Sequence, residues 1–387
     1  HTDYYCSHRY HVLSTDNMRN WTIHKNAFSS RGENDEVPYS DKLLFAPDGM
    51  FHDGNFYLYY CQPDRRQAEG VAVSGQPAGP FVDGSPMNVG PYQEIDPAVF
   101  RDDDGQVYYL WGQFTLKMAR MNPDMKSIDR ESIRDSILTE DRHFFHEGAY
   151  LTKREGLYYL IYADISRGQT PTCLGYATSR SPMGPYTYRG VIIDNDHADP
   201  AAWNNHGSIA RFREQWYIFY HRPTHNSRMM RKACVEPVTF LPDGSIPEVE
   251  MTSQGSGPPL HAFHTLDAAS ACQMYGNVRI EAIGEGNEAL CRIHHNDRMV
   301  FRNLDFGNNG PDSIQIKVKP GPHETTLALK TGYPWKESLA TLHVLAQGDT
   351  VSWITLKAPV RKVSGVHALW IVAYGTKGQS DRDRKSV

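Results

Sequence analysis

Four polar side chains recur along the chain at intervals of about 50 residues. Asp48, Asp96, Glu147 and His206 are separated by 48, 51 and 59 residues. Each precedes a short apolar run, a turn and a second run rich in Tyr and Phe. Carboxylates brought together by a fold can do general acid and base chemistry. A single acid before a strand often only caps a turn, but the fourfold repetition favours a shared site.

Two facing carboxylates suit the hydrolysis of a glycosidic bond. One carboxylic acid protonates the leaving oxygen, and a second carboxylate activates water from the opposite face of the sugar. In an inverting site the two carboxyl groups lie about 6.5–9.5 Å apart, which leaves room for the water. Glu147 is the best candidate acid because Gly148 beside it has no side chain to block a substrate. Asp96 is the best candidate for a neighbouring charge that keeps this acid protonated.

Four other residues are candidates for the same site. His206 takes the repeat position, and a histidine there can help to bind Ca²⁺ with water in the remaining positions, although calcium prefers oxygen ligands. Arg231 is either a hydrogen-bond donor to substrate or a carboxylate, or a surface charge. Phe45 and Trp111 either stack on a sugar ring or pack in the core.

The repeats themselves predict the fold that must position these residues. A period near 50 residues with several short strands in each unit is typical of a β-propeller. In that fold the innermost strand of each blade lines a central axis, so equivalent positions converge. The repeats are APDGMFHDGNFYLYYC (46–61), IDPAVFRDDDGQVYYLWG (95–112), HEGAYLTKREGLYYLIYA (146–163) and NHGSIARFREQWYIFYHR (205–222).

The pattern changes near Met251, where a stretch rich in Gly, Ser and Pro begins. Beyond it, apolar and polar residues alternate between turns, which predicts a β-sandwich. The chain is therefore expected to be all-β. We predict a propeller over 1–252, a linker over 253–261, a sandwich over 262–376 and a polar tail over 377–387.

Composition excludes several classes of partner. The formal charge of −5 is small, and without a dense Lys/Arg block a nucleic-acid partner is not expected. No apolar run approaches the roughly 20 residues that a membrane-spanning helix needs. The six cysteines are widely spaced without a CxxC pair, which argues against zinc and favours buried free thiols, with one or two disulfides left open. No signal peptide is visible, and the compartment stays open, with a secreted or periplasmic location favoured.

On these motifs, residues 1–252 resemble glycoside hydrolase family 43, five-bladed propellers that hydrolyse arabinosides and xylosides with inversion. IDPAVFRDDDG (95–105) is similar to the segment that carries the family's Asp modulating the acid's pKa, which implies that role for Asp96. HEGAYL (146–151) is similar to the acid motif, which implies that Glu147 is the proton donor.

The resemblance extends to three further positions. NNHGSI (204–209) is similar to the segment with the histidine that binds a central calcium, which implies that role for His206. RKACVEP (231–237) resembles a segment with an active-site arginine, here Arg231. Asp48 stands in a segment that resembles the family's second blade, where it is expected to line the pocket.

The predicted sandwich resembles a family 6 carbohydrate-binding module, a jelly roll, mainly through IEAIGEG (280–286) and VFRNLDFGN (300–308). The aromatic residues that could form a sugar platform there are Tyr275, Trp335 and Trp353.

One part of the family pattern is not matched. The family's general base is an Asp on the first strand of the first blade, and no such segment precedes YHVLSTDNMRNW (10–21). We therefore expect an incomplete first blade and a base upstream of residue 1. Asp3 and Asp199 are the other carboxylates to compare.

These inferences favour an inverting, exo-acting glycosidase that acts on arabinose- or xylose-containing plant hemicellulose or arabinan. The sequence does not choose between the two sugars. A catalytically inactive glycan-binding protein of the same fold is the alternative, because the base segment is not seen. A related five-bladed enzyme acting on fructosides is a further alternative.

Overall fold

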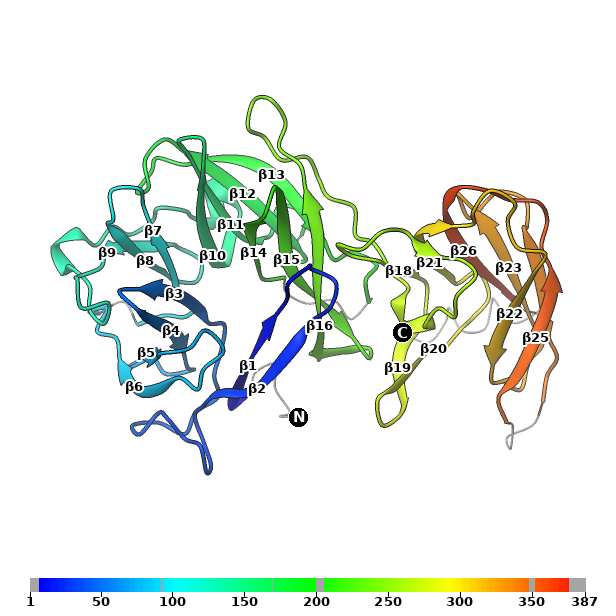
Figure 1. The fold of residues 1–387 in the computed structure, drawn as a ribbon, viewed down its shortest axis with the longest axis horizontal. Helices are drawn as coiled ribbons and strands as arrows, with labels where there is room; N and C mark the ends of the chain where they lie inside the picture. Colours follow the sequence, from blue (N-terminus) through cyan, green and yellow to red (C-terminus); the bar gives the residue numbers. More distant parts are fainter. Residues whose placement is uncertain (1–6, 92, 169, 200–204, 348–351, 376–387) are drawn as a thin grey trace. The chain divides into compact units, whose positions relative to one another are not determined.

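The computed structural model describes residues 7–91, 93–168, 170–199, 205–347 and 352–375, almost wholly as β-strands and the turns between them (Figure 1). Contacts divide the chain into two compact units. The first comprises His1–Asp194, Trp203–His221 and Ala233–Glu250, and the second comprises Asn195–Ala202, Arg222–Lys232 and Met251–Val387. The second unit thus includes two segments that lie within the predicted propeller range.

The strands of the predicted propeller range form five sheets in chain order. The first sheet holds β1 (Arg9–Ser14) and β2 (Thr22–Ser29), and the second β3 (Asp48–His52), β4 (Asn55–Cys61), β5 (Glu69–Ser74) and β6 (Val82–Pro86). The third holds β7 (Ala98–Arg101), β8 (Val107–Trp111) and β9 (Lys117–Arg120), and the fourth β10 (Phe145–Arg154), β11 (Leu157–Asp164), β12 (Cys173–Ser179) and β13 (Thr187–Asp194). The fifth holds β14 (Gly207–Phe212), β15 (Gln215–Thr224) and β16 (Ser227–Val238). Each predicted repeat supplies the first two strands of one sheet.

Turn chemistry explains two of these hairpins. Asp53-Gly54 joins β3 to β4 and Glu155-Gly156 joins β10 to β11, and all four residues have positive φ. Two-residue turns of this kind match the right-handed twist of the flanking strands. The Asp-Gly and Glu-Gly pairs therefore set the register of the strands that begin each repeat.

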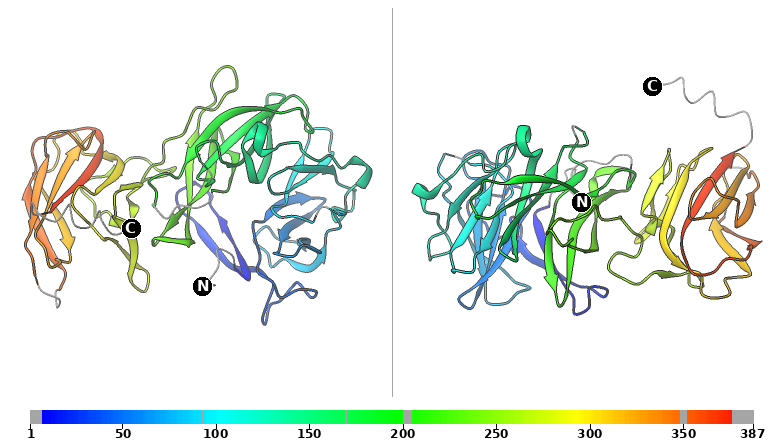
Figure 2. Two further views of the ribbon diagram at one scale, coloured as in Figure 1. Left: turned by 180° about the vertical axis from the view of Figure 1, so that it is seen from behind. Right: turned by 90° about the horizontal axis from the view of Figure 1, so that it is seen from above.

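Successive sheets meet through their first strands. β3 contacts β7, β7 contacts β10, and β10 contacts β14. At the other end of the series, Arg213 Nη2 in the β14–β15 turn donates to the Asp16 carbonyl oxygen in the β1–β2 turn at 3.0 Å. The sheets therefore follow one another around a common axis, as the sequence repeat predicts, and Figure 2 shows this succession from two further sides.

The core between the second and third sheets is aromatic. Tyr59, Tyr109 and Trp111 are fully buried, with the Tyr109 ring 5.6 Å from Tyr59 and 5.7 Å from Trp111, centroid to centroid. A fully buried ring presents no face to a sugar. Of the two alternatives that the sequence leaves open for Trp111, stacking on a sugar ring or packing in the core, its full burial favours packing.

The second unit contains a mixed sheet and two smaller antiparallel pairs. The sheet has the order β17 (Leu260–His261), β21 (Arg298–Asp305), β26 (Val366–Gly375), β23 (Thr325–Thr331), β24 (Ala340–Val344), with β18 (Gln273–Tyr275) also on β21. The pairs are β19 (Arg279–Gly284) with β20 (Asn287–Cys291) and β22 (Ser313–Val318) with β25 (Ile354–Pro359). Met299, Phe301 and Leu329 of the sheet pack in one cluster with Ile316 and Leu356 of the second pair. Two sheets with a shared apolar core form the predicted sandwich.

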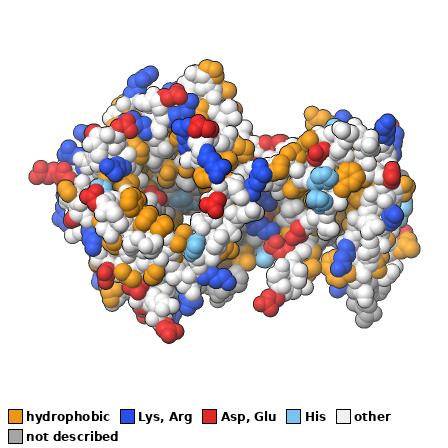
Figure 3. Space-filling view, viewed as in Figure 1, with side chains coloured by type: hydrophobic (Ala, Val, Ile, Leu, Met, Phe, Trp, Pro, Cys, Tyr) orange, Lys and Arg blue, Asp and Glu red, His pale blue; other side chains and the backbone are white. Residues whose placement is uncertain are grey.

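Three further expectations concern the cysteines, membrane-spanning helices and the surface charge. The cysteines that the structure describes, at positions 61, 173, 234, 272 and 291, are free thiols. No helix among the described residues is long and apolar enough to span a bilayer. Acidic and basic side chains are interspersed over the face in Figure 3, in keeping with the small net charge.

Candidate active site

Glu147 lies near the start of β10, where the strand is irregular. The register with β11 shifts on both sides of Glu147, between Phe145 and Glu147 and between Glu147 and Tyr150. Such bulges re-aim side chains and are common next to active sites. The Glu147 side chain is buried, and its Oε2 accepts a hydrogen bond from Gln113 Nε2 at 2.8 Å. A local break in the sheet thus sets the direction of the candidate acid.

His206 lies against the backbone that follows Glu147. Gly148 has φ +65°, and a Cβ added to it would lie 2.7–2.8 Å from three atoms of the His206 ring. Real Cβ atoms do not approach other atoms so closely, so the position requires glycine on both conformational and steric grounds. The structure therefore brings His206, at the start of β14, next to the candidate acid on β10.

Asp96 lies two residues before β7 and has the unusual φ of +62° for a non-glycine residue. Its side chain is buried, and its N–H donates to Cys61 Sγ at 3.2 Å. The neighbouring Ile95 carbonyl accepts from the Gly112 N–H at 2.9 Å, and Gly112 precedes the Gln113 that contacts Glu147. Asp96 and Glu147 therefore lie at corresponding ends of adjacent first strands, linked through one turn. Strained backbone of this kind often occurs at functional sites.

Asp48, the first residue of β3, joins two sheets. Its Oδ2 accepts from the Val99 N–H of β7 at 2.9 Å, and its Oδ1 accepts from the Gly49 N–H at 2.8 Å. Burial raises the pKa of Asp48 to about 6, against the lowering effect of these hydrogen bonds. Burial, together with the charge of Asp48, also raises the pKa of Tyr150 on β10. Asp48 therefore lies where β3, β7 and β10 meet, and at least one of its oxygens is used to hold the sheets together.

Phe45 lies near Asp96, whereas Arg231 groups with the second unit. The Phe45 N–H donates to the Cys61 carbonyl at 2.8 Å, and Cys61 is the residue that accepts from Asp96. The Phe45 ring is half-buried, as a residue lining a pocket would be. Arg231 lies on β16 in the segment Arg222–Lys232.

Two other buried carboxylates have structural partners. Asp199 is fully buried in the second unit, where its Oδ2 accepts from the Asn226 N–H at 2.9 Å. Glu69, which the sequence did not single out, is fully buried and accepts from the Tyr109 hydroxyl at 2.7 Å. Burial, helped by the charges of Asp96 and Glu94, raises the pKa of Glu69 well above its usual value. Asp3 lies outside the described residues.

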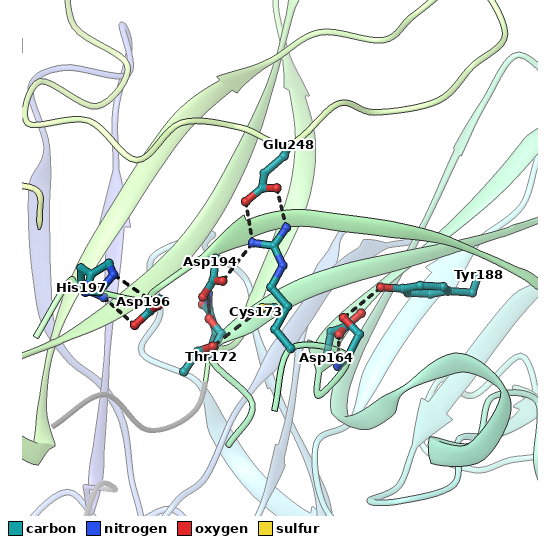
Figure 4. Close-up of polar contacts among 11 residues, drawn as sticks. Asp164, Thr172, Cys173, Tyr188, Asp194, Asp196, His197 and Glu248 are labelled. Carbon is teal, nitrogen blue, oxygen red and sulfur yellow. Dashed lines mark hydrogen bonds and ion pairs between the residues drawn. The ribbon is translucent and has the colours of Figure 1, made fainter. Parts of the chain in front are cut away.

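The loop between β11 and β12 lies at the same end of its sheet as Glu147, because Ala163 pairs with Glu147. Arg167 in this loop donates to both oxygens of Glu248 at 2.8 and 2.5 Å and to Asp194 at 3.0 Å (Figure 4). Asp164 accepts from the Ser166 N–H at 2.6 Å. A forked guanidinium and a short turn thus fix the loop beside the candidate acid.

Gln113, whose side chain contacts Glu147, was not predicted from the sequence. Its signal was weak: a polar residue after the glycine that ends a predicted strand, in YLWGQF (109–114). The contact depends on the conformation of a turn, which residue types alone did not indicate.

The described residues around His206 offer few of the ligands that calcium requires. Ca²⁺ takes six to eight oxygen ligands, largely carboxylates and carbonyls. Within the described ranges there is no group of three or more His, Cys, Asp or Glu side chains that could hold a metal ion. A calcium ion beside His206 would therefore be held mainly by water and backbone, and the side chains do not by themselves form such a site.

The second unit presents some of the aromatic residues that the sequence predicted as a platform. Trp335 is 75% exposed, and its ring stacks on Tyr333 with centroids 5.0 Å apart. Tyr275 instead packs against Trp370 at 5.7 Å. Of these two predicted rings, Trp335 is the one that is open to a ligand.

Comparison with known proteins agrees with this geometry. The sequence profile of Glycosyl hydrolases family 43 matches residues 1–246. The chain belongs to this family. Residues 267–382 match Carbohydrate binding module (family 6), which agrees with the sandwich of the second unit.

Individual relatives extend the match. A "Xylosidase/arabinosidase" of Thermoclostridium stercorarium is 34% identical over 62% of this chain, which spans 57% of that protein. An "Arabinoxylan arabinofuranohydrolase" of Bacillus subtilis (strain 168) is 28% identical, covering 95% of this chain and 80% of that protein. The crystal structure of a family 43 arabinoxylan arabinofuranohydrolase from Bacillus subtilis, in complex with cellotetraose, matches with a TM-score of 0.54 and 26% identity, over 95% of this chain and 85% of that one. Family 43 is a family of glycoside hydrolases, and both sequence-predicted domains have counterparts in these relatives.

We expect Gly148→Ala to lower both stability and activity, because the new Cβ meets the His206 ring and the backbone is strained. Strain at positive φ costs about 1–3 kcal/mol on its own. Gly156→Ala is the matched control, since Gly156 has φ +74° but open space around its Cβ position. Urea unfolding and hydrolysis rates should show a larger loss for Gly148→Ala. Equal losses would mean that the His206 contact is unimportant.

We expect Asp48→Asn to flatten the pH dependence of the unfolding free energy between about pH 4 and 6. The folded pKa of about 6 exceeds the unfolded value near 3.9, so Asp48 stabilises the protein below about pH 4 and this contribution is lost as pH rises through 6. A shift of this size corresponds to about 2–3 kcal/mol. Urea unfolding at several pH values measures the difference, with Asp53→Asn in the same hairpin as the charge-loss control. Parallel curves for the native protein and Asp48→Asn would contradict the expectation.

Proposed function

We propose that this protein is an inverting, exo-acting hydrolase that releases terminal α-L-arabinofuranosyl or β-D-xylosyl units from plant hemicellulose or arabinan. The observation that carries the proposal is the placement of buried Glu147 and Asp96 at corresponding ends of adjacent first strands. The names of the Thermoclostridium and Bacillus relatives support the choice of sugars.

In the proposed reaction, Glu147 gives its proton to the glycosidic oxygen as the bond to the anomeric carbon breaks. Water forms the new bond from the opposite face and loses a proton to a base carboxylate, so the configuration inverts. Asp96 supplies a negative charge near the acid and helps to orient Glu147 or the sugar. Burial of both carboxylates strengthens their electrostatic effect on the substrate.

The base itself is not assigned among the described residues. Asp48 accepts a hydrogen bond from the Val99 backbone N–H. Asp199 and Glu69 are fully buried and accept hydrogen bonds from the Asn226 N–H and the Tyr109 hydroxyl. This observation favours a second candidate function, a glycan-binding protein without turnover. Release of reducing sugar from arabinoxylan and from 4-nitrophenyl arabinofuranoside and xyloside by the full-length protein separates the two functions, and binding without release would support the second.

We expect Glu147→Gln to lower kcat by about 10³-fold or more on substrates with poor leaving groups, because the proton donor is lost while the shape is kept. Asp96→Asn should cause a smaller loss. Glu155→Gln is the control, since this glutamate is exposed in the turn that follows β10. Near-native rates for Glu147→Gln, with unfolding curves unchanged, would remove Glu147 from the acid's role.

We also propose that Ca²⁺ binds near His206, which would supply one nitrogen ligand with water in the remaining positions. A ligand that binds only the folded state stabilises it by about 2.7 kcal/mol at 100 times its Kd. Addition of Ca²⁺ to EGTA-treated protein should therefore raise the unfolding midpoint, and His206→Gln should abolish the increase. Mg²⁺ is the control ion. An unchanged midpoint with millimolar Ca²⁺ would refute the calcium proposal and leave the assignment of Glu147 untouched.

A further inference from the structure

The turn between β8 and β9 touches the strand that carries the proposed acid at two points. Gln113 Nε2 donates to Glu147 Oε2 at 2.8 Å. The backbone N–H of the next residue, Phe114, donates to the carbonyl of His146 at 2.7 Å. One contact reaches the carboxyl group itself, and the other reaches the residue before it. The turn is therefore fixed to β10 where Glu147 leaves the regular strand.

The backbone of Gln113 is hydrogen-bonded to Glu94, which forms an ion pair with Lys117. Its N–H donates to Glu94 Oε2 at 2.8 Å, and Glu94 Oε1 lies 2.7 Å from Lys117 Nζ. The Lys117 side chain is only 3% exposed, and its Nζ also donates to Thr115 Oγ1 at 2.8 Å. Because the Lys117 ammonium group is buried, loss of Glu94 would remove its nearest anion, whereas the Glu94 side chain is 30% exposed and reaches solvent.

The conformation of the turn leaves no room for a side chain at its first position. Gly112 has φ +130°, and a Cβ there would lie 2.3 Å from the Thr115 carbonyl oxygen and 3.0 Å from Glu94 Oε2. Phe114 has φ +66°, which is rare for a bulky residue. A turn with two unusual backbone conformations, two contacts to β10 and an ion pair to a buried lysine is more elaborate than a connection between two strands requires.

The direction of the hydrogen bond bears on the proposed chemistry. Since the Gln113 amide donates to Oε2, that oxygen acts as an acceptor, and the transferable proton of the carboxylic acid is left to Oε1. A neutral amide also adds no charge that would compete with Asp96. Fixed orientation matters because small displacements of a catalytic group cost about 10²-fold in rate.

We infer that Gln113 is a positioning residue for the general acid: it holds the Glu147 carboxyl in one orientation and directs its proton to Oε1. The Glu94–Lys117 ion pair holds Gln113 in turn. This inference rests on the proposed function, because it assumes that Glu147 donates the proton. If Gln113 only tied the turn to β10, its loss would lower stability and affect all substrates alike.

The test compares leaving groups that need the acid with leaving groups that do not. Gln113→Ala and the isosteric Gln113→Glu, in the full-length protein, are assayed on phenyl and 2,4-dinitrophenyl glycosides of the preferred sugar. We expect kcat on the phenyl glycoside to fall about 10- to 100-fold with KM within about twofold of native. On the dinitrophenyl glycoside, whose dinitrophenolate leaving group needs no protonation, we expect kcat to fall less than about threefold.

Two lysine variants extend the test to the ion pair. Lys117→Met should show the same dependence on leaving group with a smaller loss, because Gln113 keeps its side chain but loses its support. Lys153→Met is the matched control, since Lys153 forms ion pairs with Asp102 and Asp103 away from Glu147. Its kinetics should stay near native on both substrates.

Other results would contradict either the positioning role of Gln113 or the proposed function. Equal losses on both substrates, or unfolding of both Gln113 variants, would assign the residue a purely structural role, and no loss on either substrate would refute any role in positioning Glu147. Glu147→Gln, assayed in parallel, distinguishes failure of the proposed function from failure of the positioning role. If it shows no dependence on leaving group, the proposed function fails. If it does and the Gln113 variants do not, only the positioning role fails.

Discussion

The close approach of neighbouring first strands is the constraint on which the site depends. At the meeting of β10 and β14, the His206 ring occupies the space that any side chain on residue 148 would need. Between β3 and β7, the Asp48 carboxylate accepts the hydrogen bond of the Val99 N–H in place of a backbone carbonyl. Because these contacts are tight and directional, each first strand has little freedom to shift. The packing of the sheets therefore holds the backbone that carries the carboxylates, and the turn at Gln113 contacts the Glu147 carboxyl group itself.

This packing brings buried acidic side chains together, among them Glu69 and Asp96. Burial is the main cause of the raised pKa of Glu69, and the negative charges of Asp96 and Glu94 raise this pKa further. Like charges held together oppose folding, so the sheets must stabilise an arrangement that the isolated side chains would avoid. Such a cost is typical of sites where function requires groups that stability alone would not select.

The sequence predicted the parts of the structure that follow from periodicity. The repeat of an acid, a strand, a turn and an aromatic strand located β3, β7, β10 and β14, and with them the positions of Asp96 and Glu147. The sequence did not predict features that depend on tertiary contacts. Trp111 could equally have been a surface ring or a core ring, and only the sheet beside it settles the choice. Gln113 was missed because its role arises from positive φ angles in a turn. The grouping of Arg222–Lys232 with the second unit likewise follows no local pattern.

The hydrogen bond from Arg213 to Asp16 joins positions 197 residues apart, so the first and fifth sheets meet only after the sheets between them have been synthesised. A nascent polypeptide would have to carry the earlier sheets with faces that are not yet covered by a neighbouring sheet. Exposed apolar surface of this kind favours association with other molecules. Folding of this protein is therefore expected to be slow and sensitive to protein concentration, and any cut between the two positions would expose the same surfaces again.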